Sequence, residues 1–239
     1  MKKIHFKNID STNTYLKENF QKLPNFTIVS ASYQSKGRGR YDRVWESNSK
    51  ENSMFSILIK DKELMSLFPS LSLATSCAIL QTLKDYKIDN LSIKWPNDVY
   101  VNDKKICGIL LESISNNTEL EVLIVGVGLN VNQKDFSEEI VFKTTSMYNE
   151  INNKTFLPSL KRKIYKSILN TYLQIKNKTS NYINVAKNNN YLINKEVFAE
   201  IDNTKKLVKV IDINDDNTLK VIIDQKEYNL STGEITFHK

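Results

Sequence analysis

Hydrophobic periodicity changes character near residue 195 of this 239-residue chain. Before that point, apolar runs of strand length alternate with longer stretches of helical periodicity. After it, only short alternating runs remain, separated by Asp and Asn turns. Strands mixed with helices bury a sheet face against helix stripes, whereas short alternating runs fold as a small all-β unit. The sequence therefore predicts an α+β domain over 1–190 and a small β-domain over 191–239, with 176–194 as the boundary region.

The elements of this pattern can be placed from their periodicity and turn residues. Ser11, Thr12 and Asn13 can each cap a helix that begins near them. Strands are predicted at 4–6, 26–33, 55–59, 91–95, 99–101, 105–113, 121–132, 197–199, 208–211 and 219–222, and further helices at 71–86 and 157–175.

The composition supports a folded chain with a substantial core. Forty per cent of the residues are hydrophobic and 10% are aromatic, which excludes global disorder. The formal net charge of +7 is compatible with a nucleic-acid or anionic partner. No run of five like charges occurs, however, which favours lysine-rich solvated surfaces. A basic nucleic-acid-binding module therefore stays the alternative, not the main hypothesis.

Cysteine usage and hydropathy indicate a reducing compartment. Cys77 and Cys107 lie in apolar stretches without metal-site spacing, and two thiols in a chain of this length do not form a disulfide framework. No side chain is assigned as a metal ligand. The chain shows neither the apolar run of a signal peptide nor a run of about eighteen apolar residues. We expect a cytoplasmic protein that contacts no membrane.

A polar, glycine-containing segment at 34–45 interrupts the regular pattern. Gly37 and Gly39 let the backbone approach a ligand closely. Trp45 offers an aromatic face to a base or another ring. Because long loops are usually functional or mobile, we predict a ligand-binding loop, with a solvated basic loop or a nucleic-acid contact as alternatives. Forked donors for phosphate or carboxylate come from Arg38, Arg40 and Arg43.

A second motif begins at the end of the predicted strand 91–95. Lys94 can reach into a cleft there and stabilise negative charge on a carboxylate or phosphate. Pro96 fixes the direction of the chain as it leaves the sheet, and Asn97 and Asp98 could hold a phosphate or a metal-bound water. An ordinary strand followed by a polar turn is the alternative.

A third motif places Gly126 and Gly128 two positions apart in a predicted strand. This spacing leaves a notch for a ring or another backbone, and the amide of Asn130 suits the edge of adenine. A β-bulge without a ligand is the alternative for this motif.

In this order and spacing, the three motifs resemble the biotin–protein ligase family over nearly the whole chain. The residues that carry the resemblance are Ser11, Thr12, Asn13, Gln34, Gly37, Arg38, Gly39, Arg40, Arg43, Trp45, Lys94, Trp95, Pro96, Asn97, Asp98, Lys105, Gly108, Gly126, Gly128, Asn130, Gly233 and Glu234.

The resemblance implies a mixed sheet flanked by helices, related to class II aminoacyl-tRNA synthetases, followed by an SH3-like β-barrel. It also implies roles for individual residues, with Lys94 and Arg38 in catalysis. The implied biotin-binding residues are Ser11, Thr12, Asn13, Gln34, Arg38, Gly39, Arg40, Lys94 and Gly108, and the implied ATP and adenylate contacts are Arg40, Arg43, Trp45, Asn97, Lys105 and Asn130.

The implied reaction uses biotin, ATP and Mg²⁺, forms biotinyl-5′-AMP, and transfers biotin to a lysine of a carboxylase's biotin carboxyl carrier domain. No nucleophile–base pair is visible, since His5 and His238 lie at the extremes of the sequence, so a covalent enzyme intermediate is not expected. The resemblance begins at Ser11, which leaves no room for an N-terminal DNA-reading domain, and we expect no DNA partner. Homodimers are common in the family.

Two departures from the family pattern stand out. Asp42 replaces a loop glycine, and the family's Pro and Gly are absent from 47–51. The main rival is a lipoate or octanoyl ligase or transferase of the same fold, against which the motif at Lys94 argues.

Overall fold

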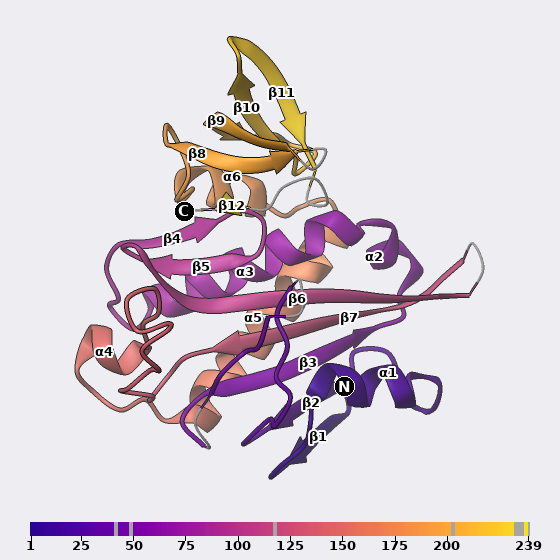
Figure 1. Ribbon diagram of the computed structural model, residues 1–239. Helices are drawn as coiled ribbons and strands as arrows, with labels where there is room; N and C mark the ends of the chain where they lie inside the picture. The colour runs from indigo at the N-terminus through magenta and orange to yellow at the C-terminus, as the bar shows by residue number, and fades with distance from the viewer. Residues whose placement is uncertain (41–42, 48–49, 117–118, 202–203, 232–236, 239) are drawn as a thin grey trace.

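A seven-stranded sheet forms the centre of the protein, with strand order β1-β2-β3-β7-β6-β5-β4 (Figure 1). The computed structural model describes residues 1–40, 43–47, 50–116, 119–201, 204–231 and 237–238. Neighbouring strands pair antiparallel, apart from the parallel pair β1 and β2. The strands are β1 (Lys3–Phe6), β2 (Ile28–Ala31), β3 (Ser53–Ile59), β4 (Leu91–Lys94), β5 (Asp98–Val101), β6 (Lys104–Asn116) and β7 (Glu119–Leu129).

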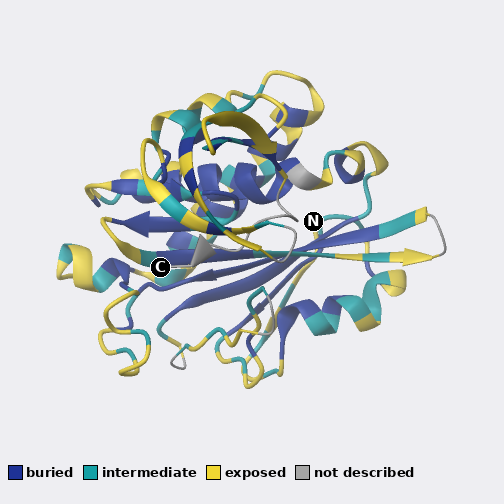
Figure 2. Cartoon of the chain, turned by 45° about the horizontal axis from the view of Figure 1, so that its top comes forward, coloured by how far each residue is buried: buried dark blue, intermediate teal, exposed yellow. Residues whose placement is uncertain are grey.

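Side-chain alternation along these strands gives the sheet two different faces. On one face, Leu16 of α1 (Thr12–Asn19) packs against Val29, Leu58 and Ile124. The opposite face carries the main core, against which α3 (Phe68–Lys84) and α5 (Leu157–Lys176) pack (Figure 1). The central strands are therefore buried on both sides, while exposed residues gather on loops and outer helix surfaces (Figure 2).

A second, smaller sheet follows near the C-terminus. It has the order β11-β10-β9-β8-β12 and is antiparallel throughout, as expected for the terminal β-unit. Its strands are β8 (Glu196–Ile201), β9 (Thr204–Ile213), β10 (Leu219–Ile223), β11 (Lys226–Leu230) and β12 (Phe237–His238). Its buried residues belong to the same apolar cluster as the main core, so the two sheets share one hydrophobic interior.

The region expected to be the boundary between the two units is itself structured. It contains α6 (Tyr182–Asn188), whose Ala186 is fully buried. Beyond α6, the chain adds to the outer edge of β4: Ile93 donates its backbone N–H to Asn189 at 2.7 Å, and Tyr191 donates to Ile93 at 2.9 Å. These bonds satisfy an edge strand that would otherwise expose unpaired backbone groups. The division at residue 190 stays a prediction.

Asn217, in the turn between β9 and β10, ties the smaller sheet to the larger one. It is 6% exposed, and its carbonyl accepts a hydrogen bond from Trp95 Nε1 at 2.9 Å. Its side chain donates to Ser70 and accepts from the Tyr182 hydroxyl, both at 2.8 Å. The indole ring of Trp95, the residue that follows Lys94 in the second motif, is therefore held by a turn of the C-terminal sheet.

The expected mixed sheet, its flanking helices and the terminal β-unit are confirmed. The first helix, predicted to extend to Pro24, consists of α1 followed by a 3-10 turn, η1 (Phe20–Lys22). Three short helices were not predicted: α2 (Lys62–Ser66), α4 (Met147–Ile151) and α6. Asp42 and the C-terminal segment 232–235, which contains Gly233 and Glu234 of the family resemblance, lie outside the described residues. Among the described residues, no helix is long and apolar enough to cross a membrane.

Candidate active site

The floor of the candidate site is a patch of small side chains on the α1 face of the sheet. Gly128 pairs with Gly108 of β6 on one side, and Gly126 pairs with Ser56 of β3 on the other. The register is regular through both β7 glycines, so the alternative of a β-bulge is wrong. With so few side-chain atoms at these positions, the sheet is hollowed where β3, β7 and β6 meet.

A cluster of hydrogen-bonded polar side chains lies at one end of this hollow. Ser11 caps α1 by accepting from the Thr14 amide at 3.4 Å, which fixes Thr12 and Asn13 in the first turn. The Thr12 amide and hydroxyl both donate to Gln34 Oε1, at 2.7 and 2.9 Å. Ser56 links Thr12 to Asn13, because its hydroxyl contacts Thr12 Oγ1 at 2.6 Å and donates to Asn13 Oδ1.

The glycine-containing segment forms a narrow strap over the sheet. Gly39 donates its amide to the Arg43 carbonyl at 2.7 Å, and Trp45 donates to the Gly37 carbonyl at 3.0 Å. An antiparallel bridge between Arg38 and Val44 completes this arrangement. A side chain at Gly37 would collide with the Trp45 carbonyl, so glycine is required there by close approach.

Trp45 lies in the notch that the sequence predicted. A Cβ atom at Gly128 would lie 2.7 Å from Trp45 Nε1, so the ring occupies the space that the glycine leaves. Lys105 Nζ lies over the same ring, 5.6 Å from its centroid. The indole N–H is buried and has no hydrogen-bond partner among the described residues. The indole N–H is therefore available to donate a hydrogen bond to a ligand.

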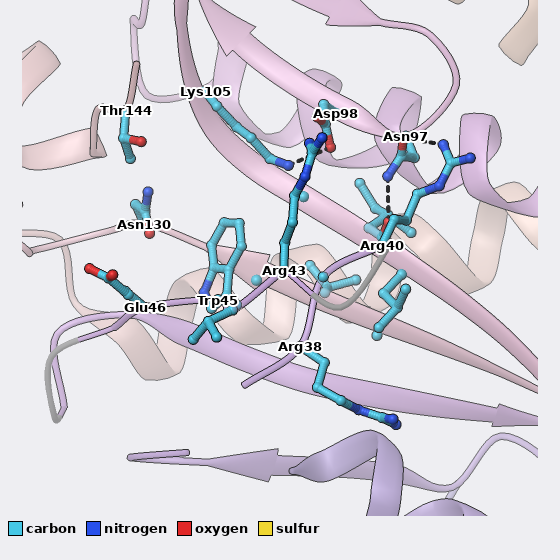
Figure 3. Close-up of a pocket in the computed structure, with 18 of the residues that line it drawn as sticks. Arg38, Arg40, Arg43, Trp45, Glu46, Asn97, Asp98, Lys105, Asn130 and Thr144 are labelled. Carbon is cyan, nitrogen blue, oxygen red and sulfur yellow. Dashed lines mark hydrogen bonds and ion pairs between the residues drawn. The ribbon is translucent and has the colours of Figure 1, made fainter. Parts of the chain in front are cut away.

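Cationic side chains gather at the other end of the hollow (Figure 3). Lys105 forms an ion pair with Asp98 at 2.7 Å, and the Arg43 side chain points toward the same pair. Arg40 donates to Asn97 Oδ1 at 3.3 Å, while Asn97 donates to the Ile109 carbonyl at 2.7 Å.

Lys94 reaches the same end from the last position of β4. Its Nζ lies 5.5 Å from the centroid of the Tyr100 ring. Burial, followed by the negative charge of Asp98, raises the pKa of Tyr100 above its ordinary range, so this phenol stays protonated at neutral pH. The site therefore joins positive charge to neutral hydrogen-bonding groups, which suits an anionic ligand.

Asn130 follows β7 and is 2% exposed. Its amide nitrogen donates to the Thr145 carbonyl at 3.0 Å, which fixes the orientation of the amide. Its Oδ1 is buried and lacks a hydrogen-bond partner within the described part of the chain. An amino group, such as that of adenine, would satisfy this acceptor.

Cys107 is the thiol nearest to these residues, and it is fully buried. Burial raises its pKa well above the ordinary value for a thiol, so it is not a thiolate nucleophile. Cys107 is therefore not a candidate nucleophile, and a reaction without a covalent enzyme intermediate stays a prediction.

Every residue that the sequence predicts for the site lines a single cavity of about 630 Å³. Ligand pockets typically have volumes of roughly 300–1,000 Å³. Arg38 and Lys94 come from segments far apart in the chain, and both contribute to this lining. The predicted residues in the lining are Ser11, Thr12, Asn13, Gln34, Arg38, Gly39, Arg40, Arg43, Trp45, Lys94, Asn97, Lys105, Gly108 and Asn130.

Comparisons with known proteins agree with this geometry. Residues 5–130 match the biotin/lipoate A/B protein ligase family, and this span is more than half of the chain. The chain belongs to this family. The match begins in β1 and ends at Asn130, so it contains all the predicted site residues.

Relatives of this family member include the bifunctional ligase/repressor BirA of Bacillus subtilis, which is 35% identical over 126 residues. That match covers 52% of this chain and 39% of BirA, so the chain spans well under half of this relative's length. The biotin–[acetyl-CoA-carboxylase] ligase of Paracoccus denitrificans is 32% identical over 124 residues, 51% of each protein.

Among solved structures, the biotin protein ligase of Aquifex aeolicus in complex with biotin and ATP is similar over its whole length. The TM-score is 0.85 at 28% identity, covering 100% of this chain and 99% of that one. The similarity therefore includes the smaller C-terminal sheet, which the family match does not reach.

Glu112 is not part of the cavity lining but contacts two residues of it, and the sequence predicted no role for this carboxylate. It lies on the same face of β6 as Gly108 and contacts both Asn13 and Arg38. The available signal was a carboxylate at an alternating position of an otherwise apolar strand. The wall formed by Phe136 and the 139–144 segment was also missed, and no sequence pattern marks it.

Proposed function

We propose that this chain is an ATP-dependent biotin–protein ligase. In the first step, a biotin carboxylate oxygen attacks the α-phosphorus of ATP, forming biotinyl-5′-AMP and releasing pyrophosphate. In the second step, a lysine amine of an acceptor protein attacks the acyl carbon, loses a proton, and expels AMP. The observation that carries this proposal is the single cavity that joins a hydrogen-bonding polar end to a cationic end.

The polar end suits the head group of biotin, a neutral ring with both donors and acceptors. Thr12, Asn13 and Gln34 are fixed by one another and by Ser56 before any ligand arrives. A preorganised polar surface of this kind loses little conformational entropy on binding. Ser11, Gly39 and Gly108 line the same cavity.

The cationic end suits the activated carboxylate and the phosphates. Lys94 at this end and Arg38, which lines the same cavity, are the proposed catalytic groups, and Arg40, Arg43 and Lys105 supply further positive charge. Such groups accelerate the reaction because they stabilise the charge that develops as the carboxylate attacks phosphorus. No proton transfer from a protein base is needed for this step.

Two lysines compete for the contact with the acyl phosphate. Lys94 lies over Tyr100, whereas Lys105 lies close to Gly108 and over the Trp45 ring. We assign the contact to Lys94 and the neighbouring phosphate region to Lys105. Lys94→Ala should then slow adenylate formation more than Lys105→Ala does, whereas the reverse order would exchange the two roles.

Adenine is proposed to lie between Trp45 and Asn130. The indole supplies an aromatic face and an N–H donor, and Asn130 Oδ1 accepts from the exocyclic amino group; neither atom has a hydrogen-bond partner in the described part of the chain. Both groups line the same cavity as Thr12.

Mg²⁺ is proposed to arrive with ATP. In the described part of the chain, no group of three His, Cys, Asp or Glu side chains could hold a metal ion by itself. Mg²⁺ bound to nucleotides takes most of its ligands from phosphates and water, with one or two carboxylates from the protein. Asp98 and Glu46 line the cavity and fit that requirement. The ion would offset phosphate charge.

The proposed acceptor is the biotin carboxyl carrier domain of a carboxylase, and the proposed compartment is the cytoplasm. The acceptor is supported by the similarity to the Paracoccus denitrificans biotin–[acetyl-CoA-carboxylase] ligase. Incubation of the chain with biotin, MgATP and a carrier domain, followed by intact-mass measurement, tests the proposal. We expect the mass of one biotinyl group to be added, only with ATP and only on a carrier that keeps its acceptor lysine.

A lipoate ligase of the same fold is the second candidate, since the family name includes both substrates. Thermal-shift measurements with biotin and with lipoate, each with ATP, separate the two. Stabilisation by lipoate and not by biotin would overturn the proposed substrate.

A further inference from the structure

Glu112 lies beside the polar end of the cavity and is shared by two cations and an amide. Its Oε1 accepts from Lys17 Nζ at 2.7 Å, and its Oε2 accepts from Asn13 Nδ2 at 2.6 Å. The Arg38 guanidinium donates to both oxygens through one nitrogen, at 3.1 and 3.2 Å. The Glu112 side chain is only 16% exposed, so these partners replace most of its hydration.

The contact with Arg38 is the weakest of the three. It has the longest distances, and the Arg38 side chain is 42% exposed, compared with 33% for Lys17. It also uses one guanidinium nitrogen, whereas strong arginine–carboxylate pairs use two parallel N–H donors. Arg38 is therefore the partner that Glu112 gives up most easily.

Arg38 is turned away from the cationic end of the cavity. In Figure 3 its side chain points away from Arg43 and Lys105, toward the part of the fold that holds α1. Lys17 and Asn13, both on α1, occupy the remaining acceptor positions of Glu112. If Arg38 leaves, Glu112 keeps one cation and one amide, so no buried charge is left unpaired.

We propose that Glu112 is a positioning residue that competes with the anionic ligand for Arg38. With the cavity empty, Glu112 holds Arg38 at the side of α1. A carboxylate or phosphoryl group in the cavity draws the guanidinium across, while Lys17 neutralises the carboxylate left behind. The same carboxylate holds the amide nitrogen of Asn13, so that its Oδ1 faces Ser56. This role rests on the proposed function.

If Glu112 and the ligand compete for Arg38, a substitution at Glu112 should change the affinity for an anionic ligand but not for a neutral one. Loss of a purely structural residue would change both affinities alike. Glu112→Gln keeps the size of the side chain and an oxygen for Asn13, but it removes the charge that holds Arg38. Binding of an anionic, non-hydrolysable biotinyl-AMP analogue should then become about two- to fivefold tighter, the range expected for loss of a partly exposed ion pair. Binding of biotinol, a neutral biotin analogue, should stay within about twofold.

Lys17→Met is the matched variant with the opposite expected sign. Lys17 contacts Glu112 without lining the cavity, and its loss leaves Arg38 as the only cation on the carboxylate among the described residues. The adenylate analogue should bind more weakly to this variant, again with biotinol unchanged. Arg38→Ala combined with Glu112→Gln should remove the gain seen in Glu112→Gln alone.

Calorimetric titration of these variants with both ligands tests the proposal. It is overturned if Glu112→Gln weakens both ligands equally, which is the result of a structural role, or if its gain persists after Arg38→Ala. A wild-type chain that binds neither ligand would instead refute the proposed function. Circular dichroism spectra of the variants that match the wild type exclude misfolding as the cause of any change.

Discussion

Gly126 and Gly128 offer a way to disturb the two ends of the cavity separately with the same chemical change. A Cβ atom at Gly128 would meet the Trp45 ring, with Nε1 at 2.7 Å and Cζ2 at 2.8 Å. One at Gly126 would meet the Asn13 amide, with Nδ2 at 2.9 Å and Cγ at 3.0 Å. Because the obstacles are side chains and not backbone, we expect each alanine to displace its neighbour while the sheet stays intact.

The sizes of the two effects follow from what each neighbour loses. Gly128→Ala removes the Trp45 ring from its notch, and burial of a large apolar side chain contributes about 1.5–3 kcal/mol. If half of that is lost from nucleotide binding, the KM for ATP rises about fourfold to twelvefold. Gly126→Ala breaks the bonds of Asn13 to Glu112 and Ser56, each worth about 1 kcal/mol, so biotin binding weakens roughly tenfold to thirtyfold.

The assays are calorimetry with biotin alone and ATP–pyrophosphate exchange at saturating biotin. Gly126→Ala should weaken biotin binding in the calorimetry, and Gly128→Ala should raise the KM for ATP in the exchange assay. Melting temperatures close to that of the wild type would show that both variants fold. The reasoning is refuted if both alanines weaken the same ligand, or if each affects the ligand assigned to the other.

Three further predictions address other parts of the molecule. Lys94→Ala should slow adenylate formation by about a hundredfold, as for loss of a preorganised charge-stabilising group, and wild-type rates in a radiolabelled-biotin assay would remove Lys94 from the mechanism. Asn217→Ala should lower the free energy of unfolding, measured in urea, by about 2 kcal/mol, because it removes a buried side-chain hydrogen bond to Ser70 and a part-buried one from Tyr182; an unchanged midpoint would contradict this. Burial, followed by the charge of Lys161, lowers the pKa of His5 below its ordinary value of 6.5. The unfolded chain therefore binds a proton at His5 more readily than the folded chain, so the free energy of unfolding should fall as the pH drops below 6.5. In pH-dependent unfolding, His5→Gln should reduce this fall, and an unaltered pH dependence would count against the assignment.

The sequence predicted the main elements of the fold because their patterns are local. The strands at β3, β6 and β7 and the helices α3 and α5 are apolar runs of the expected period, which burial in the core enforces. Short helices such as α2, with five residues, contain too few periodic positions to be predicted in this way.

The lining of the site was predicted more completely than its internal contacts. Glycines, arginines and the residues around Lys94 are unusual in sequence and therefore visible. The ion pair of Glu112 with Arg38 joins residues 74 positions apart, and the tie between Trp95 and Asn217 joins residues 122 apart. Such pairings depend on the register of the sheet and on how the second sheet packs, which no local pattern encodes.

If the proposed function is correct, biotin and ATP meet in a single cavity and react there without an acceptor present. The direct measurement is mass spectrometry of the small molecules released by denaturing the chain after incubation with biotin and MgATP. The account predicts biotinyl-5′-AMP in near-stoichiometric amount, reduced in Lys94→Ala. Free biotin and unreacted ATP from a folded, ligand-saturated wild-type chain would contradict it.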